Sequence, residues 1–147
     1  MLQRLLSSHR ARRYQRRVRT VTIDAARARV RRGAAYLDDA DDGWHARLNP
    51  GTLELADGAH CVLGQLHGGF RTGLLRARII DLSSAPIASL SPVDLGFQAR
   101  RDLGEEIEAL DYAFLNRAWR EELVSRRGER EVSSAVESPV RIATADA

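Results

Sequence analysis

The residues best suited to direct chemistry are the single cysteine, Cys61, and three of the histidines, His45, His60 and His67. Structural zinc sites usually take their ligands from two clusters, each with a pair of residues two to four positions apart. His60 and Cys61 are adjacent, so their side chains point in different directions. The pattern favours a buried thiol that packs as a small hydrophobic group beside surface histidines, and we predict no metal ion or other cofactor.

Cys61 is also a candidate nucleophile. A thiolate is favoured in the first turn of a helix, where Cys61 can lie, but nucleophilic catalysis also needs a base and a group that orients it. Four histidines and one cysteine make no such pattern, and no paired carboxylates stand out. We therefore predict a non-catalytic protein with no catalytic residues.

A glycine-rich run from Gly64 to Gly69 matches two kinds of functional loop only in part. It lacks the Gly-Lys-Ser/Thr ending of a phosphate-binding loop, and the sequence has no Gly-x-Ser-x-Gly motif to accompany an oxyanion-hole loop at His67. The acidic residues 38–43 do not fit a calcium loop, because alanine occupies position 40 and no glutamate is suitably placed. We expect turn glycines and a solvated acidic turn.

Residues 60–78 fit the order of a DNA-binding helix-turn-helix. Gly64 would lie where the two helices cross, and Leu74 and Leu75 would hold the second helix inward. That second helix would carry residue types that contact phosphates and guanine edges, namely Arg71, Thr72, Arg76 and Arg78. His67 precedes the turn where an apolar residue is preferred, and two glycines follow it, so a helical hairpin that serves only the core is the alternative.

A basic arm precedes the rest of the chain. Residues 1–20 contain seven arginines and no acid, and self-repulsion predicts that the arm is disordered when unbound. The candidate nucleic-acid-binding residues in it are Arg10, Arg12, Arg13, Arg16 and Arg17. Two alternatives stay open: an organelle-targeting peptide, or a translation start further downstream, near Val18 or Val21.

Charge is distributed unevenly along the chain. Residues 1–32 hold eleven arginines and one acid, a formal charge of +10, while the remaining residues hold twelve arginines and nineteen acids, a formal charge of −7. A basic segment attracts nucleic acid, anionic lipid or an acidic protein surface. All 23 basic residues are arginine, which a GC-rich genome explains without selection for arginine itself. Without residues 1–20 the protein would be acidic and a poor ligand for DNA.

Hydrophobic periodicity predicts a mainly α-helical single domain over residues 21–127, with short central helices. Helices are expected over 24–40, 57–67, 70–80 and 104–127, with a short helix or turn after Trp44, a loop over 81–103 and a disordered tail over 128–147. In the first helix one face is apolar, and the arginines are expected to project from the other faces (Arg27, Arg29, Arg31 and Arg32).

The last predicted helix has an apolar stripe made of Leu103, Ile107, Leu110, Phe114 and Ala118, which Leu115, Trp119 and Leu123 continue. Its acids lie early and Arg126 and Arg127 lie late, as the helix dipole favours. Trp44 and Trp119 could stack on bases or on a partner. With only eight aromatic residues in the chain, core packing is the expected role of both tryptophans.

Short motifs resemble a group of small uncharacterised proteins of actinobacteria and their phages. The motifs are Gly43-Trp44, Leu53-Glu54-Leu55, Cys61-Val62-Leu63-Gly64-Gln65-Leu66, Gly96-Phe97 and Ala118-Trp119-Arg120. The resemblance covers about residues 21–124 and implies a bacterial or phage cytoplasmic protein, without implying an activity. Because it begins near residue 21, it also favours the downstream start.

The expected compartment and function rest on three features of the sequence: it has no long apolar run, it has a single cysteine, and its N-terminal arm is basic. No apolar run approaches the ~20 residues that span a bilayer, so no membrane insertion is expected. One cysteine forms no intrachain disulfide, which favours the cytoplasm. We predict a small binding or regulatory protein that contacts DNA or RNA through its arginine-rich arm. The alternative is a protein-interaction or phage accessory module that binds no nucleic acid.

Overall fold

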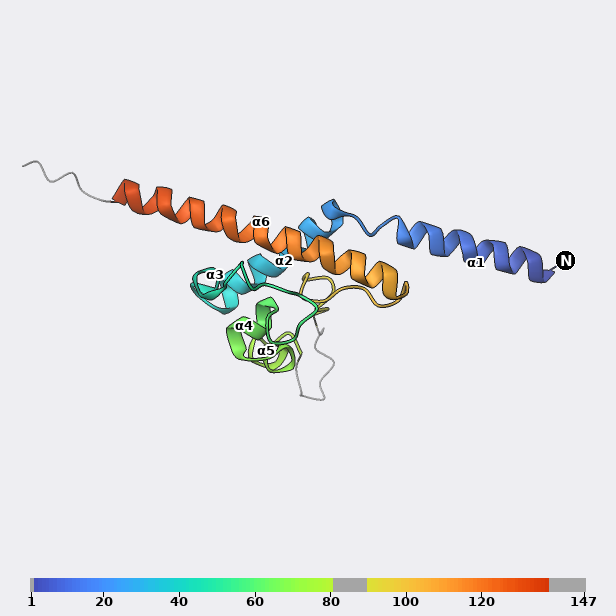
Figure 1. The fold of residues 1–147 in the computed structure, drawn as a ribbon, viewed down its shortest axis with the longest axis horizontal. Coiled ribbons are helices and arrows are strands. Elements are labelled where there is room, and N and C mark those ends of the chain that lie inside the picture. Colours follow the sequence, from blue (N-terminus) through green and yellow to red (C-terminus); the bar gives the residue numbers. More distant parts are fainter. Residues whose placement is uncertain (1, 81–89, 138–147) are drawn as a thin grey trace, which may run out of the picture.

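The computed structural model describes residues 2–80 and 90–137, and the described part is helical with no strand (Figure 1). Its helices are α1 (Leu2–Val18), α2 (Ile23–Ala40), α3 (Trp44–Arg47), α4 (Val62–His67), α5 (Phe70–Arg76) and α6 (Glu105–Glu137). The predicted fold class, a mainly α single domain with short central helices, is confirmed.

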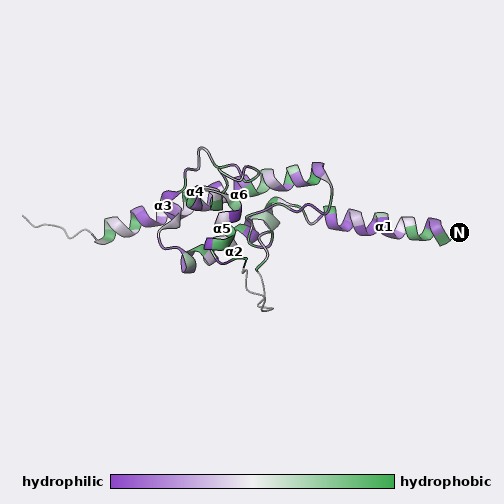
Figure 2. Cartoon of the chain, turned by 90° about the horizontal axis from the view of Figure 1, so that it is seen from below, coloured by the Kyte–Doolittle hydropathy of each residue, from purple (hydrophilic) through white to green (hydrophobic). Residues whose placement is uncertain are grey.

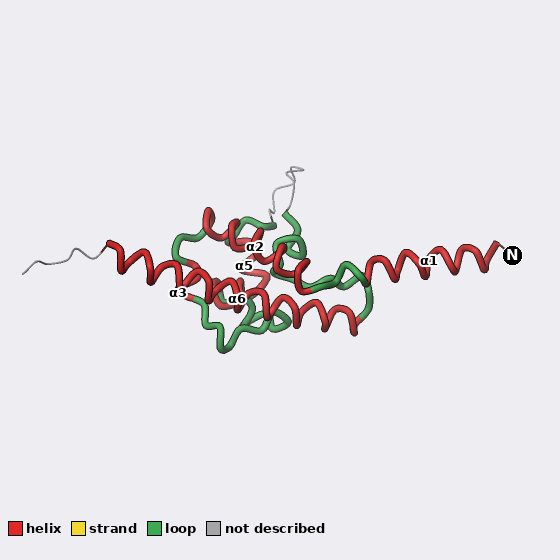
Figure 3. The backbone as a smooth tube through the Cα atoms, turned by 90° about the horizontal axis from the view of Figure 1, so that it is seen from above, coloured by secondary structure: helices red, strands yellow, loops and turns green. Residues whose placement is uncertain are grey.

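The two long helices of the body, α2 and α6, pack against each other (Figure 3). Helix α2 begins where the sequence predicts, because the Thr22 hydroxyl accepts a hydrogen bond from the amide of Ala25 at 3.1 Å. Its apolar face is buried as predicted (Ala26, Val30, Ala34 and Leu37). Gly33 lies on the same face, and an added Cβ there would lie 2.0 Å from the carbonyl oxygen of Leu95. The 90–103 segment therefore crosses α2 at van der Waals contact.

Both tryptophans are fully buried at the centre of the core, as predicted. Their rings meet edge to face at a centroid distance of 5.8 Å, and Phe97 stacks on Trp119 at 5.5 Å. Each indole N–H has an acceptor: the carbonyl of Gly96 at 2.7 Å for Trp119, and Asp38 at 2.9 Å for Trp44. These rings join α3, α6 and the 90–103 segment into one core.

The short central helices are shorter than predicted. Asp57 caps a turn rather than a helix, since its carboxylate accepts from the amide of Ala59 at 2.9 Å, and α4 starts only at Val62. Helix α5 ends at Arg76 instead of continuing to residue 80, because Arg78 adopts a left-handed backbone conformation with φ of 56°. The two helices form a hairpin below α2 and α3 (Figure 1).

Helix α6 differs from the prediction in its length and in its buried face. It continues to Glu137 rather than ending at Arg127, so the part of the predicted disordered tail that is described is helical. Leu110, placed in the predicted apolar stripe, is 42% exposed, while Asp111 is 1% exposed. The helix is thus rotated relative to the predicted stripe, and a carboxylate lies in the core.

The basic arm also differs from the prediction of disorder, because residues 2–18 form α1. None of its residues is buried, and it extends away from the body beyond the start of α6 (Figure 1). Of the predicted 81–103 loop, residues 90–103 contain no helix. Residues 81–89, and 138–147 of the predicted tail, lie outside the described residues.

Candidate nucleic-acid interface

Helix α1 carries all five arginines that the sequence analysis placed in the arm. Only its C-terminal half contacts the body. The Tyr14 hydroxyl donates to the carbonyl of Leu103 at 2.9 Å, and Arg17 forms an ion pair with Asp102. These contacts fix the direction of α1 and leave the remaining arginines in solvent.

Helical spacing sorts the arginines of the arm into two rows. Arg10, Arg13 and Arg17 lie three and four positions apart, which places them along one side of α1. Arg12 and Arg16 form a second row by the same spacing. Apart from Arg17, none of these side chains has a hydrogen-bonded or ionic partner among residues 2–80 and 90–137. Before Arg17, the arginines of the arm therefore present positive charge that no acid of the described residues pairs with.

The second predicted set, Arg71, Arg76 and Arg78, is exposed on and just after α5. This set lies on the α4–α5 hairpin, away from α1, so the two basic sets do not form one surface (Figure 1). The predicted order of helix, glycine turn and helix is present, and Gly68 has the left-handed conformation (φ 88°) that ends α4.

Two details of the hairpin correct the sequence analysis. The helices cross at Gly73, where an added Cβ would lie 2.5 Å from the Cβ of Leu63. Gly64 instead packs on the loop before α4, 2.2 Å from the carbonyl oxygen of Gly58 by the same measure. Leu75 is 44% exposed and does not hold α5 inward. With seven residues, α5 is about 10 Å long, which is short for a helix that reads a groove.

Cys61 is the N-cap of α4. Its sulfur accepts a hydrogen bond from the amide of Gly64 at 3.2 Å and lies 3.6 Å from the carbonyl oxygen of Gly58. Burial raises the pKa of the thiol, an effect larger than the opposing one of the helix amides. The thiolate expected at a helix start is therefore disfavoured, and the arrangement is that of a structural cap.

The histidines lie apart from one another. His60 pairs with Asp57 at 2.7 Å on the surface, and His45 packs its ring edgewise on Trp44. His67 on α4 turns its Nε2 atom into a buried position without a hydrogen-bond partner among the described residues, and burial lowers its pKa. In residues 2–80 and 90–137 no group of three or more potential ligand side chains could hold a metal ion.

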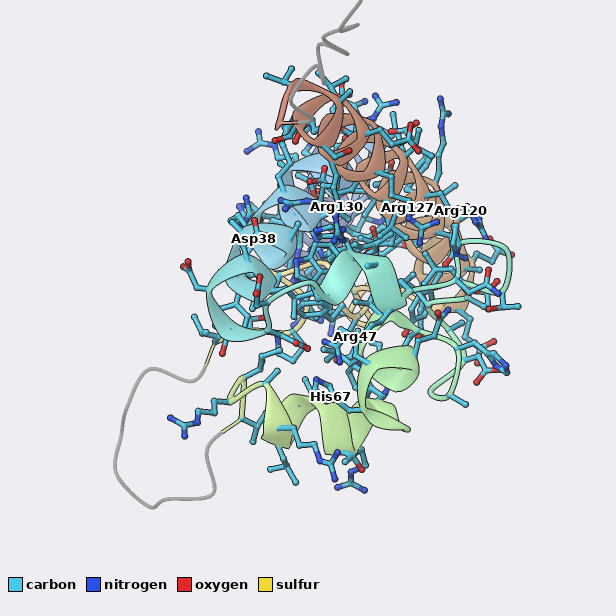
Figure 4. The ribbon with its side chains drawn as sticks, turned by 90° about the vertical axis from the view of Figure 1, so that its left-hand side faces the viewer. Asp38, Arg47, His67, Arg120, Arg127 and Arg130 are labelled. Carbon is cyan, nitrogen blue, oxygen red and sulfur yellow. The ribbon has the colours of Figure 1, made fainter. Side chains whose placement is uncertain are left out.

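A set of arginines that bind backbone carbonyls was not predicted from the sequence. Arg120 donates to the carbonyl of Leu53 at 2.6 Å, and Arg127 donates to that of Leu48 at 2.6 Å. Figure 4 shows Arg120, Arg127 and Arg130 following one another along α6. These bonds attach the irregular 48–53 segment to the helix, so part of the arginine content has a structural role.

Arg29 has the same role for the 93–98 segment, and here the prediction was wrong. It was expected to project outward but is 9% exposed. It donates to the carbonyls of Val93 at 2.7 Å and Gln98 at 2.8 Å, and to both oxygens of Asp111 at 2.8 and 2.9 Å. The signal in the sequence was spacing: Arg29 lies three residues after buried Ala26, and Asp111 four before buried Leu115.

Comparison with protein-family models, with curated proteins and with solved structures gives no match. The resemblance to actinobacterial and phage proteins therefore stays a prediction. Among the described residues, no helix has the length and apolar character needed to cross a bilayer.

Proposed function

We propose that the protein binds the phosphate backbone of nucleic acid through α1, with little dependence on sequence. The observation that carries the proposal is that the α1 arginines before Arg17 are exposed and have no acid or carbonyl partner among the described residues. Many arginines of the body are held by acids, as Arg27 is by Glu121 at 2.8 Å, or by carbonyls, as Arg120 is. Arg71, Arg76 and Arg78 also lack such a partner in the described chain, but they lie on or just after the seven-residue α5. Arg10, Arg12, Arg13 and Arg16 lie on an exposed helix and have no such partner within the described chain.

The shape of α1 suits this role. Seventeen helical residues measure about 25 Å, and the major groove of DNA admits one α-helix. Two rows of arginines on different sides of such a helix can reach the phosphates of both groove walls. Single strands can bind the same charges, although with a weaker dependence on salt.

The test uses the full chain and two matched triple variants. R12Q/R13Q/R16Q removes three charges from α1, and R71Q/R76Q/R78Q removes three from the α4–α5 hairpin and the residues after it. Both variants have the same net charge, so a difference in their affinity for nucleic acid depends on where the arginines were removed. Binding of a labelled duplex and a labelled single strand is measured by fluorescence anisotropy across a salt series.

We expect the α1 variant to lose most of its affinity and the hairpin variant to retain it. Each lost phosphate contact lowers the slope of log K against log salt by about 0.9 on a duplex, so the α1 variant should lose about 2.7. The reverse ranking would assign binding to the helix-turn-helix arrangement. Absence of binding by the unmodified chain would overturn the proposal and favour a protein partner.

A further inference from the structure

The acid-rimmed groove is an open depression of about 430 Å³ between α6 and the segment before α4. Three glutamates line it, Glu54, Glu105 and Glu108, and Glu108 also pairs with Arg101 at 3.3 Å. Its floor is mostly apolar and is made by Ala109, Tyr112 and Ala113. The alanine side chains beside Tyr112 are small and leave room for larger apolar side chains from outside.

The groove is held in shape by Asn116 at one end. The Asn116 amide oxygen accepts from the backbone of Leu55 at 2.8 Å, and its nitrogen donates to Glu54 at 2.9 Å. These bonds fix the 54–56 segment beside α6, so the depression exists before anything binds. An acidic rim over an apolar floor fits a helix that is basic and carries apolar anchors.

The N-terminal end of α1 has this chemistry. Leu2, Leu5 and Leu6 are 77%, 66% and 56% exposed, and hydrophobic residues lie toward this end of the helix (Figure 2). Their spacing of i, i+3 and i+4 is the anchor pattern of a helix that binds in a groove. Arg10 lies one turn after Leu6 on the same side of the helix, and α1 contains no acid.

The leucines cannot occupy the groove of their own chain in this arrangement. Tyr14 and Arg17 attach the C-terminal half of α1 to Leu103 and Asp102 and direct its N-terminus away from the body (Figure 1). Reaching its own groove would require α1 to reverse about residues 19–21 and to give up both contacts. The leucine end is therefore available to another molecule.

We propose that the acid-rimmed groove binds the leucine end of α1 from a second copy of this chain. The unequal charge of the chain supports this occupant, because the basic N-terminal segment of one copy meets the acidic body of the other. If the exchange is reciprocal about a two-fold axis, it closes as a dimer. The nucleic-acid proposal is tested at Arg12, Arg13 and Arg16, further along α1, and does not depend on this association.

Sedimentation velocity of the full chain, without nucleic acid, tests the proposal over a concentration series. Two variants address the two sides of the contact: L5N/L6N on α1, and E105R/E108R on the rim. Leu5 and Leu6 are exposed, so their substitution leaves the folded core unchanged. L75N, at an exposed leucine on α5, is the matched control.

We expect a concentration-dependent dimer that L75N preserves and that each of the two double variants weakens about tenfold or more. A mixture of the two double variants should associate more strongly than either alone, because the intact α1 of one fits the intact groove of the other. A chain that stays monomeric, or a dimer that neither variant weakens, would overturn the proposal. L5N/L6N retains every arginine, so its salt-dependent binding of duplex reports separately on the nucleic-acid proposal.

Discussion

Arg29 and Asp111 form an ion pair that joins α2 to α6 in the interior of the protein, with Nη1 of Arg29 lying 2.8 and 2.9 Å from the two carboxylate oxygens. The pair is fully hydrogen-bonded: Arg29 also donates to the carbonyls of Val93 and Gln98, and Asp111 accepts from the amide of Arg100 at 2.9 Å. It therefore holds the irregular 93–100 segment against both long helices.

Asp111→Ala should lower the free energy of unfolding by about 3–5 kcal/mol, because it leaves the Arg29 charge buried without a counter-ion. Chemical denaturation followed by tryptophan fluorescence measures the change. Glu121→Ala, which breaks the exposed pair with Arg27, is the control and should have little effect. A loss below about 1 kcal/mol for Asp111→Ala would show that water or a rearranged loop replaces the carboxylate.

Gly33→Ala should destabilise the protein by about 1–3 kcal/mol or more, because its Cβ would lie 2.0 Å from the carbonyl oxygen of Leu95 and 3.2 Å from Trp119. Gly128→Ala is the matched control in the other long helix. It has open space around it and should stabilise α6 by about 0.5–1 kcal/mol. Thermal unfolding of both variants checks the contrast, and equal effects would contradict the close contact of Leu95 with α2.

His67 should make stability fall as the solution is acidified. Its pKa is lowered in the folded protein by burial, so between that value and the ordinary value of about 6.5 the unfolded chain binds more protons. The contribution of His67 to the free energy of unfolding is therefore full above about pH 6.5 and is lost as the pH falls toward and through the pKa of His67 in the folded protein. His67→Gln should flatten this dependence in denaturation at pH 5 to 8, whereas His9→Gln on exposed α1 should not. If the free energy of unfolding depended on pH in the same way in the wild type and in His67→Gln, His67 would not be the cause of the loss at low pH.

Cys61 should react slowly with thiol reagents in the folded protein. Burial raises the pKa of the thiol, and the sulfur serves as the cap of α4. Labelling with an aromatic disulfide at pH 8 should proceed at the rate of local or global opening and accelerate to that of a free thiol in denaturant. Rapid labelling under native conditions would indicate an activated thiolate instead.

The sequence predicts elements well where apolar periodicity is strong. The first body helix was placed within one residue, since Thr22 caps it and its buried residues recur every three or four positions. The extension of α6 beyond Gly128 was missed because this part buries nothing that imposes a pattern. Arg29 was placed on the wrong side of α2 because its buried position depends on Asp111, 82 positions away along the chain.

Only part of the candidate nucleic-acid interface could be predicted from the sequence. The sequence identifies the arginines of α1, because their density and the absence of acids are properties of the sequence. It does not show which arginines are already bound within the protein. Arg120 and Arg127 are bound to carbonyls of the 48–53 segment, whereas the α1 arginines before Arg17 have no partner in the described chain.

The salt dependence of duplex binding by the unmodified chain and by R12Q/R13Q/R16Q shows whether α1 is the nucleic-acid interface. If α1 binds the phosphate backbone, log K should fall linearly with log salt, and the variant should show a slope smaller by about 2.7 together with weaker binding. An equal slope and affinity for the two proteins would contradict the claim that α1 is the nucleic-acid interface.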